Sequence, residues 1–295
     1  MTAVLASWLL FVLFFLGLWL AIHNLLPFLS YAVIRARDIA LGQIESHEKL
    51  ATLLGRRETG WERWKSWTPV VSILIAGFAA SAVTGWVFAQ LAEALREASP
   101  RLLEIDQRVH GIAVNLHTQA GTDFFTFFTV VGTPVGLAIL CVVVSVLLAI
   151  ERRYRWVAYL AVTTGVGALL NISLKAYFAR ERPDLSVALR HASGYSFPSG
   201  HAMGAAVVFG ALAYMGVRRF TTWRARSATL AIAATSIIAI ALSRIYLGVH
   251  WITDIVAGIS AGTLWVVTAT LAYETFRRVR LLRSKEERSD STRRA

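Results

Sequence analysis

The sequence predicts an all-α protein that crosses a membrane several times. Hydrophobic residues make up 56% of its 295 positions, more than the roughly 45–50% of soluble domains. Several apolar runs of about 20 residues follow one another, and a helix of that length spans a hydrocarbon core of about 30 Å. Arginines gather in the short segments between these runs, as they do in cytoplasmic loops. The net charge of +12 therefore points to a membrane surface rather than to nucleic acid.

The N-terminal part of the chain predicts a membrane anchor followed by an amphipathic segment. The apolar run Val4–Leu29 is longer than a signal-peptide core and has no basic region before it, so we expect it to be retained. Residues 35–65 are of mixed charge, and Trp61, Trp64 and Trp67 recur on one side of a helix. We expect this segment to lie along the cytoplasmic interface, with a partner-binding surface as the less favoured alternative.

Further apolar runs complete a set of seven predicted spans. They are Pro69–Leu91, Phe124–Ile150, Trp156–Phe178, His201–Val217, Ser227–Val249 and Trp251–Phe276. Gly77, Ser81 and Gly85 form a stripe of small residues, which close helix packing explains. Residues 93–123 form a polar connection, and the basic tail Arg277–Ala295 is expected to be disordered beyond its first turns.

The distribution of charge predicts an orientation and also marks a site. The segments after the first, third, fifth and seventh runs are rich in arginine, so we expect the amino terminus outside and the carboxyl terminus in the cytoplasm, in an inner or plasma membrane. One outer connection breaks this rule, because Lys175, Arg180, Arg182 and Arg190 lie in it or at its edge, and Arg244 lies near the outer end of the sixth run. Charged groups at membrane depth are costly and mark a functional site by default.

Three short stretches bring polar and charged residues to this outer face. They are Lys175–Pro183, Pro198–His201 and Ser243–Asp254. Lys175, Arg182 and Arg244 are permanent cations of the kind that bind phosphate oxygens. Ser199 and Gly200 begin the fifth run, where the free amide groups of a helix amino terminus favour an anion. An ordinary helix cap is the alternative for this pair, but beside the cations the sequence predicts a phosphate site.

A histidine beside a carboxylate predicts a nucleophile. His250 and Asp254 are four residues apart and share one face of a helix. A carboxylate fixes the imidazole tautomer and leaves the other ring nitrogen free to attack phosphorus. Taken alone, such a pair is more often structural, and the neighbouring cations favour the catalytic interpretation. His201 is then the candidate acid that protonates the leaving oxygen and later activates water.

The remaining histidines and the single cysteine have no comparable group of charged residues near them in the sequence. The remaining histidines are expected at interfaces or in loops, with His191 as a weaker site candidate, and they are His23, His47, His110, His117 and His191. No cluster of Asp or His offers ligands for a divalent metal, and the single cysteine, Cys141, lies in an apolar run. We therefore expect metal-independent catalysis and no cofactor.

The three stretches resemble the signature of the type 2 phosphatidic acid phosphatase family, also called lipid phosphate phosphatases. The signature K-x₆-R-P, P-S-G-H and S-R-x₅-H-x₃-D is present from Lys175 to Pro183, from Pro198 to His201 and from Ser243 to Asp254. The resemblance implies a nucleophile at His250 oriented by Asp254, with His201 as acid and base. It also implies phosphate contacts from a second set of residues, which are Lys175, Arg182, Ser199, Gly200 and Arg244.

The resemblance implies a domain organisation and a substrate class. Residues 69–276 would form a six-helix phosphatase core, preceded by one extra transmembrane helix and a cytoplasmic segment in 1–68 and followed by a cytoplasmic tail in 277–295. The expected partners are membrane lipids and a lipid phosphate or diphosphate, such as undecaprenyl diphosphate, phosphatidylglycerol phosphate or phosphatidic acid. A lipid phosphotransferase with the same site is the main alternative.

Two other classes fit less well. Soluble vanadium-dependent haloperoxidases share the signature, but seven apolar spans argue against a soluble enzyme. A transporter or scaffold would line a path across the bilayer with its charges, whereas these charges concentrate at one face.

Overall fold

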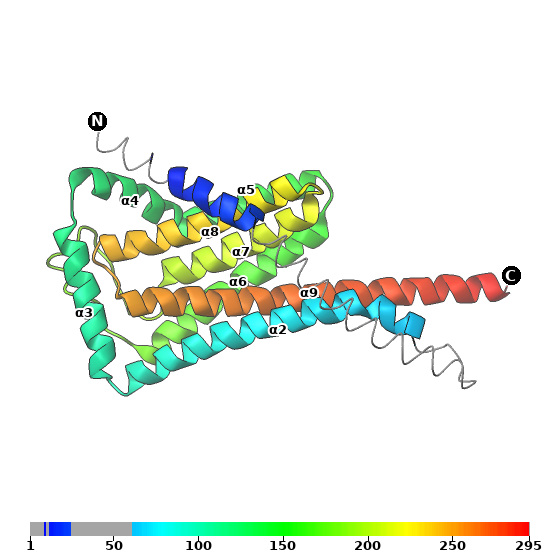
Figure 1. The fold of residues 1–295 in the computed structure, drawn as a ribbon, viewed down its shortest axis with the longest axis horizontal. Helices are drawn as coiled ribbons and strands as arrows, with labels where there is room; N and C mark the ends of the chain where they lie inside the picture. The colour runs from blue at the N-terminus through cyan, green and yellow to red at the C-terminus, as the bar shows by residue number, and fades with distance from the viewer. Residues whose placement is uncertain (1–8, 10–11, 25–60, 295) are drawn as a thin grey trace.

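The computed structural model describes residues 9, 12–24 and 61–294, and within these ranges every regular element is a helix (Figure 1). The predicted all-α class is therefore confirmed. Residues 4–8, 10–11 and 25–29 of the predicted first span, Val4–Leu29, and residues 35–60 of the predicted amphipathic segment 35–65 lie outside the described residues. A short apolar helix, Val12–Asn24, represents the part of the first span that is described.

The remaining helices follow one another with short connections, except for the longer loop before α7. They are α2 (Trp61–Arg96), α3 (Pro100–Asn115), α4 (Gln119–Val131), α5 (Pro134–Ile150), α6 (Tyr154–Phe178), α7 (Gly200–Arg219), α8 (Trp223–Tyr246) and α9 (Ile252–Arg294). Among the described residues, five helices are long and apolar enough to cross a membrane, and the bent pair α4 and α5 would make a sixth. The chain is thus a multi-pass membrane protein.

Helix α7 lies at the centre of the bundle and packs against α6, α8 and α9. Half of its spanning residues are buried. The approach to α9 is close because α9 presents glycines: a Cβ on Gly258 would lie 2.8 Å from the carbonyl oxygen of Ser199, and one on Gly262 would lie 2.7 Å from that of Met203. This packing fixes the start of α7 against the start of α9.

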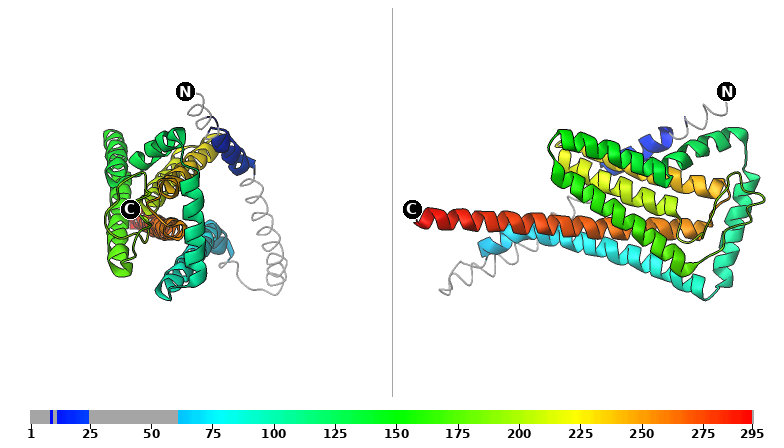
Figure 2. Two further views of the ribbon diagram at one scale, coloured as in Figure 1. Left: turned by 90° about the vertical axis from the view of Figure 1, so that its left-hand side faces the viewer. Right: turned by 180° about the vertical axis from the view of Figure 1, so that it is seen from behind.

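Helix α3 crosses one end of the bundle, while α2 runs along α9 (Figures 1 and 2). The predicted polar connection 93–123 therefore contains a helix of its own. Its buried residues Leu102, Asp106 and Ala113 face the bundle, and the rest of α3 is more exposed. One of these three buried residues, Asp106, is a carboxylate.

The predicted run Phe124–Ile150 is not one continuous helix. It is divided into α4 and α5, which meet at an angle of 55°. Thr133 caps α5 by accepting a hydrogen bond from the backbone of Gly136 at 3.0 Å, and Pro134 follows as the first helical residue. Because proline has no N–H and restricts the residue before it, α4 cannot continue through this point. The helical run also starts earlier than predicted, at Gln119.

The basic tail also differs from the prediction. Helix α9 continues to Arg294 and extends past the rest of the bundle (Figure 2), whereas disorder was expected after the first turns. Residues 281–288 are rich in Leu, Arg, Lys and Glu, which are strong helix formers. Local helix propensity therefore outweighs the high charge of this segment.

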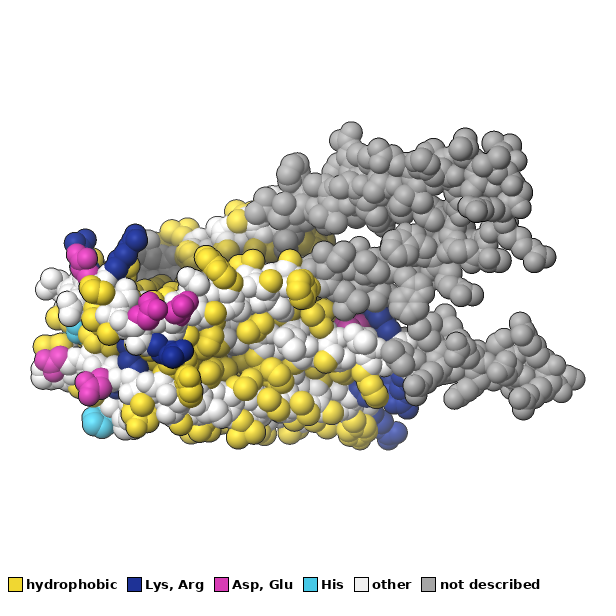
Figure 3. Space-filling view, turned by 90° about the horizontal axis from the view of Figure 1, so that it is seen from below, with side chains coloured by type: hydrophobic (Ala, Val, Ile, Leu, Met, Phe, Trp, Pro, Cys, Tyr) yellow, Lys and Arg dark blue, Asp and Glu magenta, His cyan; other side chains and the backbone are white. Residues whose placement is uncertain are grey.

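Hydrophobic side chains cover the middle of the bundle surface shown in Figure 3, whereas charged side chains gather toward its ends. Large apolar residues on the helices are strongly exposed, for example Val162 at 61%, Leu169 at 63% and Ile172 at 64%. A surface of this kind is stable against hydrocarbon and not against water. It supports a bundle whose sides face lipid.

Candidate active site

The three motif stretches meet at the end of the bundle that α3 crosses. Lys175 lies in the last turn of α6, Ser199 caps the start of α7, and Arg244 lies in the last turn of α8. The backbone N–H of Ser199 donates to the carbonyl oxygen of Asp254 at 3.0 Å, which ties the start of α7 to the start of α9. The structure thus brings together all eight predicted site residues from the ends of α6, α7, α8 and α9 and from the loops that contain Arg182 and His250.

His250 lies between a guanidinium and a carboxylate. Its Nε2 is 3.1 Å from Nη1 of Arg182, and its Nδ1 is 3.2 Å from Oδ2 of Asp254. A guanidinium only donates hydrogen bonds, so Nε2 must be the accepting nitrogen and Nδ1 the one that carries the proton toward Asp254. The lone pair of Nε2 therefore faces the cationic side of the site.

Burial lowers the pKa of His250 from 6.5 to about 4, because the charged imidazolium would be desolvated. The hydrogen bond and charge of Asp254 oppose this shift, and the charges of Arg182 and Arg244 add to it. His250 is thus neutral at physiological pH. A neutral imidazole with a free Nε2 has the form that a nucleophile requires.

Asp254 is fully buried, and its carboxylate accepts several hydrogen bonds. Its Oδ2 accepts from the backbone N–H of Trp251 at 3.0 Å, as a cap of α9, and from the hydroxyl of Ser196. Ser196 Oγ is also 3.2 Å from Nδ1 of His250. The carboxylate is therefore held in one orientation relative to the imidazole.

Two residues that brace Asp254 were not among the predicted site residues. Arg180 donates from Nη1 to Oδ1 of Asp254 at 2.7 Å and from Nη2 to Oδ2 of Asp106 at 2.6 Å. Asp106 also accepts from the backbone N–H and the hydroxyl of Thr253, at 3.1 and 2.7 Å. Arg180 was visible in the sequence as one of the unexpected outer cations. Asp106 would have been found only by noticing that it shares a helix face with Leu102 and Ala113.

Arg182 is held by carbonyl oxygens rather than by carboxylates. Its Nε donates to Gly194 at 2.9 Å, its Nη1 to Val249 at 2.8 Å and its Nη2 to Ser193 at 3.0 Å. These bonds place the guanidinium beside His250 without neutralising its charge. Burial lowers the pKa of Arg182 from its ordinary value, and Asp254 opposes the shift.

Lys175 and Gly200 meet on one side of the site. The Lys175 ammonium donates to the carbonyl oxygens of Tyr195 and Ser196. A Cβ on Gly200 would lie 3.6 Å from Cε of Lys175 and 3.0 Å from Oδ1 of Asn171. The start of α7 is therefore open to close approach by a ligand only because Gly200 has no side chain.

Two buried polar atoms in this cluster have no hydrogen-bond partner among the described residues: Nε of Arg244 and Nε2 of His201. Arg244 donates through Nη1 to the hydroxyl of Thr129 in α4. His201 is within electrostatic range of Arg244, His250 and Lys175. Buried polar atoms without partners are costly, so these two atoms indicate a place where a polar ligand group binds.

The charges at this end favour an anion. Four cations and two carboxylates leave an excess of two positive charges. The cations are Lys175, Arg180, Arg182 and Arg244, and the carboxylates are Asp106 and Asp254. Among the described residues, Lys175, Arg182 and Arg244 form no ion pair shorter than 4.0 Å, whereas both carboxylates pair with Arg180. The uncompensated charge thus surrounds His250 and His201. This excess of two positive charges is equal in size and opposite in sign to the charge of a phosphate monoester dianion.

Other titratable residues lie outside this cluster. His117 Nε2 is 2.6 Å from the carbonyl oxygen of Tyr246, the ring of His110 packs on Trp251, and His23 contacts Ser227. His47 lies outside the described residues. Within the described ranges, no group of three or more His, Cys, Asp or Glu side chains is arranged to hold a metal ion.

The fold and this cluster define a class of membrane protein. The family model of the PAP2 superfamily matches residues 156–278, which contain all three motif stretches. The chain is also 32% identical over 160 residues to phosphatidylglycerophosphatase B of Bacillus subtilis, covering 54% of this chain and 78% of that protein. The chain belongs to the PAP2 superfamily.

Two further relatives show which parts of the chain are shared. A protein of Escherichia coli K12 named putative undecaprenyl-diphosphatase YbjG is 30% identical over 139 residues, covering 46% of this chain and 66% of that protein. The crystal structure of a transmembrane PAP2-type phosphatidylglycerolphosphate phosphatase from Bacillus subtilis superimposes with a TM-score of 0.62 at 29% identity, covering 66% of this chain and 96% of that one. By their names the relatives are phosphatases or a putative diphosphatase, and about a third of this chain is not covered by the solved transmembrane structure.

Proposed function

We propose that the protein removes a phosphate group from a lipid phosphate or diphosphate through a phosphohistidine intermediate on His250. The observation that carries this proposal is the neutral imidazole of His250, whose Nε2 faces Arg182 while Asp254 holds Nδ1. The surrounding excess of positive charge supports an anionic substrate. Membership of a family of lipid phosphatases supports the choice of a lipid.

In the first step, Nε2 of His250 attacks phosphorus while the bond from phosphorus to the lipid oxygen breaks. The electron pair of that bond goes to the lipid oxygen, which takes a proton from the imidazolium form of His201 and leaves that ring neutral. Asp254 stabilises the charge that develops on the imidazole. Arg182, Arg244 and the amide groups at the start of α7 stabilise the phosphoryl oxygens during the transfer.

In the second step, water attacks the phosphorus of phosphohistidine. His201 accepts a proton from the water, the bond from phosphorus to Nε2 breaks, and His250 returns to its neutral form. Inorganic phosphate leaves. We propose that the cationic side chains replace a metal ion in both steps, so that catalysis needs no divalent cation.

The proposed site faces away from the cytoplasm. Arginine-rich connections join α5 to α6 and α7 to α8, at the end of the bundle opposite to Lys175 and Ser199. Positive charge favours the cytoplasmic side of a membrane. This orientation places the carboxyl terminus in the cytoplasm and the site at the outer or periplasmic face. Residues 69–276 then remain the proposed phosphatase core.

The test is phosphate release by the purified protein in detergent with excess chelator. The substrates are phosphatidylglycerol phosphate, undecaprenyl diphosphate and phosphatidic acid, and His250→Ala is the control. Release by the wild type alone supports the proposal. Strict dependence on added magnesium, or equal release by His250→Ala, contradicts it.

A further inference from the structure

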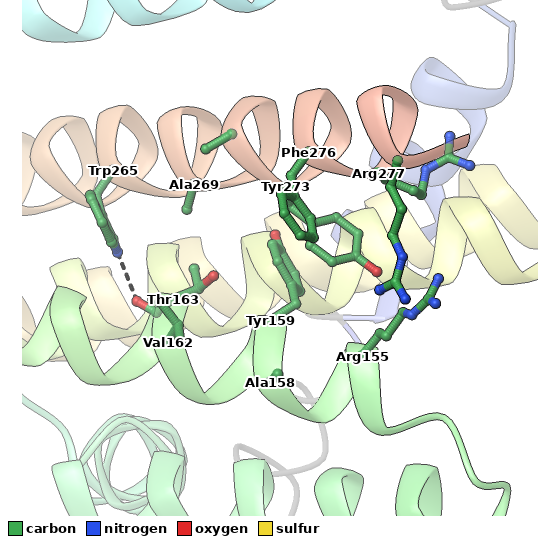
Figure 4. Close-up of a pocket in the computed structure, with 12 residues that line it drawn as sticks. Arg155, Ala158, Tyr159, Val162, Thr163, Trp265, Ala269, Tyr273, Phe276 and Arg277 are labelled. Atoms are coloured by element: carbon green, nitrogen blue, oxygen red, sulfur yellow. Dashed lines mark hydrogen bonds between the residues drawn. The ribbon is translucent and has the colours of Figure 1, made fainter. Parts of the chain in front are cut away.

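An apolar groove lies between the first turns of α6 and the later turns of α9, toward the end of the bundle opposite to the candidate active site (Figure 4). Its volume is about 420 Å³, within the range of ligand pockets. Val162 and Thr163 line it from α6, and Trp265, Ala269 and Phe276 line it from α9. None of the eight predicted site residues lines this groove, and the proposed mechanism does not use it.

Polar groups in the walls of the groove pair with one another. Trp265 donates from its indole nitrogen to the carbonyl oxygen of Thr163 at 2.7 Å, which is the dashed line in Figure 4. The hydroxyl groups of Tyr159 and Thr270 are 2.8 Å apart and form a second pair. Because these groups already have partners, the walls present mainly hydrocarbon to an occupant.

Three arginines stand at one end of the groove. They are Arg155 of α6 and Arg277 and Arg280 of α9. Figure 4 shows Arg155 and Arg277 together at this end, with Trp265 at the other. Arg277 pairs with Glu274 at 2.7 Å, whereas Arg155 and Arg280 have no ion-pair partner within 4.0 Å in the part of the chain that the structure describes. The apolar groove therefore ends at uncompensated positive charge.

The carboxylate of Glu274 does not offset this charge. Its side chain is buried, and its oxygens lie 3.4, 2.7 and 3.8 Å from nitrogens of three arginines, Arg218, Arg277 and Arg278. One negative charge is thus shared by three positive ones. An anion at this end of the groove would meet cations whose charge the protein itself leaves unbalanced.

The arginines lie where the membrane should end. Arg155 is the second residue of the candidate span Tyr154–Phe178, and Arg277 is the last but one of the span Ile252–Arg278. From Arg155 to Thr163, α6 rises about 12 Å at about 1.5 Å per residue, which lies within the roughly 15 Å of one leaflet, half of a core of about 30 Å. The arginines are therefore at the depth of lipid head groups, and the rest of the groove is at the depth of acyl chains.

The groove opens sideways onto the surface that should face lipid. Val162 at its α6 rim is 61% exposed, and Phe276 at its α9 rim is 67% exposed. A soluble anion would pair with the arginines but leave this apolar surface uncovered. A phospholipid with an anionic head group would satisfy both parts of the groove.

We propose that this groove binds an anionic phospholipid of the leaflet opposite to the candidate active site, with its phosphate at Arg155 and Arg280 and an acyl chain along Ala269. Basic pockets between transmembrane helices bind anionic head groups by the same chemistry. The bound lipid would bridge α6 and α9, the helices whose other ends carry Lys175 and Asp254. This lipid is a ligand and not the substrate, so the inference does not rest on the proposed function.

The experiment titrates dioleoyl phosphatidylserine or dioleoyl phosphatidylcholine onto the purified full-length protein in detergent. Native mass spectrometry gives the apparent dissociation constant of the first bound lipid. The two lipids have the same chains and differ in net charge, so phosphatidylserine should bind the wild type more tightly. Arg155→Gln/Arg280→Gln should weaken phosphatidylserine binding about 25-fold, at about fivefold for each arginine, and remove the preference over phosphatidylcholine.

Arg219→Gln/Arg224→Gln is the matched control. These two arginines are exposed at the same end of the bundle, at the end of α7 and the start of α8, and do not line the groove. Their loss removes the same charge and should leave the dissociation constant of the wild type. Ala269→Leu keeps every arginine but fills the groove, so it should weaken phosphatidylserine binding. The phosphatidylcholine titration of each variant is its own reference, so a general loss of stability does not imitate the effect.

Three outcomes would overturn the proposal. Equal affinity of the wild type for the two lipids, or equal losses in the two double variants, would mean that the lipid responds only to general surface charge. Unchanged binding in Ala269→Leu would mean that no acyl chain lies in the groove. A loss in Arg182→Gln without a loss in Arg155→Gln/Arg280→Gln would place the lipid at the candidate active site instead.

Discussion

Arg180 and Asp254 form a buried ion pair, with Nη1 of the guanidinium 2.7 Å from Oδ1 of the carboxylate and side-chain exposures of 7% and 0%. The second amino group of the same guanidinium pairs with Asp106 of α3 at 2.6 Å. The carboxylate beside His250 is thus held by Arg180, which stands at a variable position of the first motif and was not among the predicted site residues. That residue is in turn held by a helix that lies outside the region matched by the family model.

We predict that Asp106→Asn lowers turnover without removing substrate binding. The substitution keeps the shape of the side chain but removes the charge that pairs with Arg180, so Arg180 and Asp254 are expected to shift. Loss of a residue that orients a catalytic group costs on the order of 10–100-fold, and we expect this loss in kcat with little change in KM. Steady-state kinetics with a lipid phosphate measure both constants.

Glu104→Gln is the control for this substitution. Glu104 lies on the exposed side of α3 and, within the described part of the chain, pairs only with Arg108, with 59% and 74% of the two side chains exposed. Its removal should leave kcat unchanged, since exposed pairs contribute little. Wild-type turnover in Asp106→Asn would show that Arg180 and Asp254 do not depend on α3.

The pH dependence of folding stability should reveal the environment of His250. Burial lowers its pKa to about 4 in the folded protein, against an ordinary value of 6.5. Between these values the unfolded chain binds more protons at this residue than the folded one, so the stabilising contribution is complete above pH 6.5 and is lost as the pH falls toward 4. As the pH is lowered from 7 to 4, the unfolding temperature in detergent should therefore fall more steeply for the wild type than for His250→Asn.

The same lowered pKa of His250 predicts the pH at which the activity changes. His250 is neutral above about pH 4, so with His250 as the proposed nucleophile the limb of kcat/KM that it causes should lie near pH 4 rather than near 6.5. Identical pH dependence of unfolding in the wild type and in His250→Asn would contradict this account of its burial.

Gly132 at the break between α4 and α5 should tolerate no side chain. A Cβ there would lie 2.4 Å from Cγ2 of Ile240 and 3.3 Å from Cδ2 of His201. We expect Gly132→Ala to destabilise the protein by about 1–3 kcal/mol, the usual cost of overpacking, and to reduce kcat by displacing His201. Thermal unfolding and steady-state kinetics report the two effects.

A second substitution tests whether the clash with Ile240 causes the effects of Gly132→Ala. Adding Ile240→Ala to Gly132→Ala removes the methyl group that clashes, so kcat should recover relative to the single variant. Gly111→Ala is the matched control because a Cβ there would meet no atom within 4 Å. If Gly132→Ala behaves like Gly111→Ala, the break does not position His201.

The membrane class and the cluster of motif residues could be predicted from the sequence because both depend on local patterns. Apolar runs reveal spans, and the spacing of Lys175, Arg182, His250 and Asp254 places them at helix ends. The bracing by Asp106 could not be predicted, since it depends on how α3 crosses the bundle, which no local pattern encodes. The sequence contains a helix-breaking residue at Pro134, but the apolar residues on both sides of it favoured one continuous span over two helices.

The central claim is that His250 carries the phosphoryl group, and a trapping measurement tests it most directly. The purified protein is mixed with a lipid phosphate labelled in its phosphate group, quenched in alkali within one turnover, and the labelled peptide is identified by mass spectrometry. The account predicts a label on His250 in the wild type that is lost on mild acid treatment, and no label in His250→Ala. A label on another residue, or full turnover by His250→Ala, would contradict it.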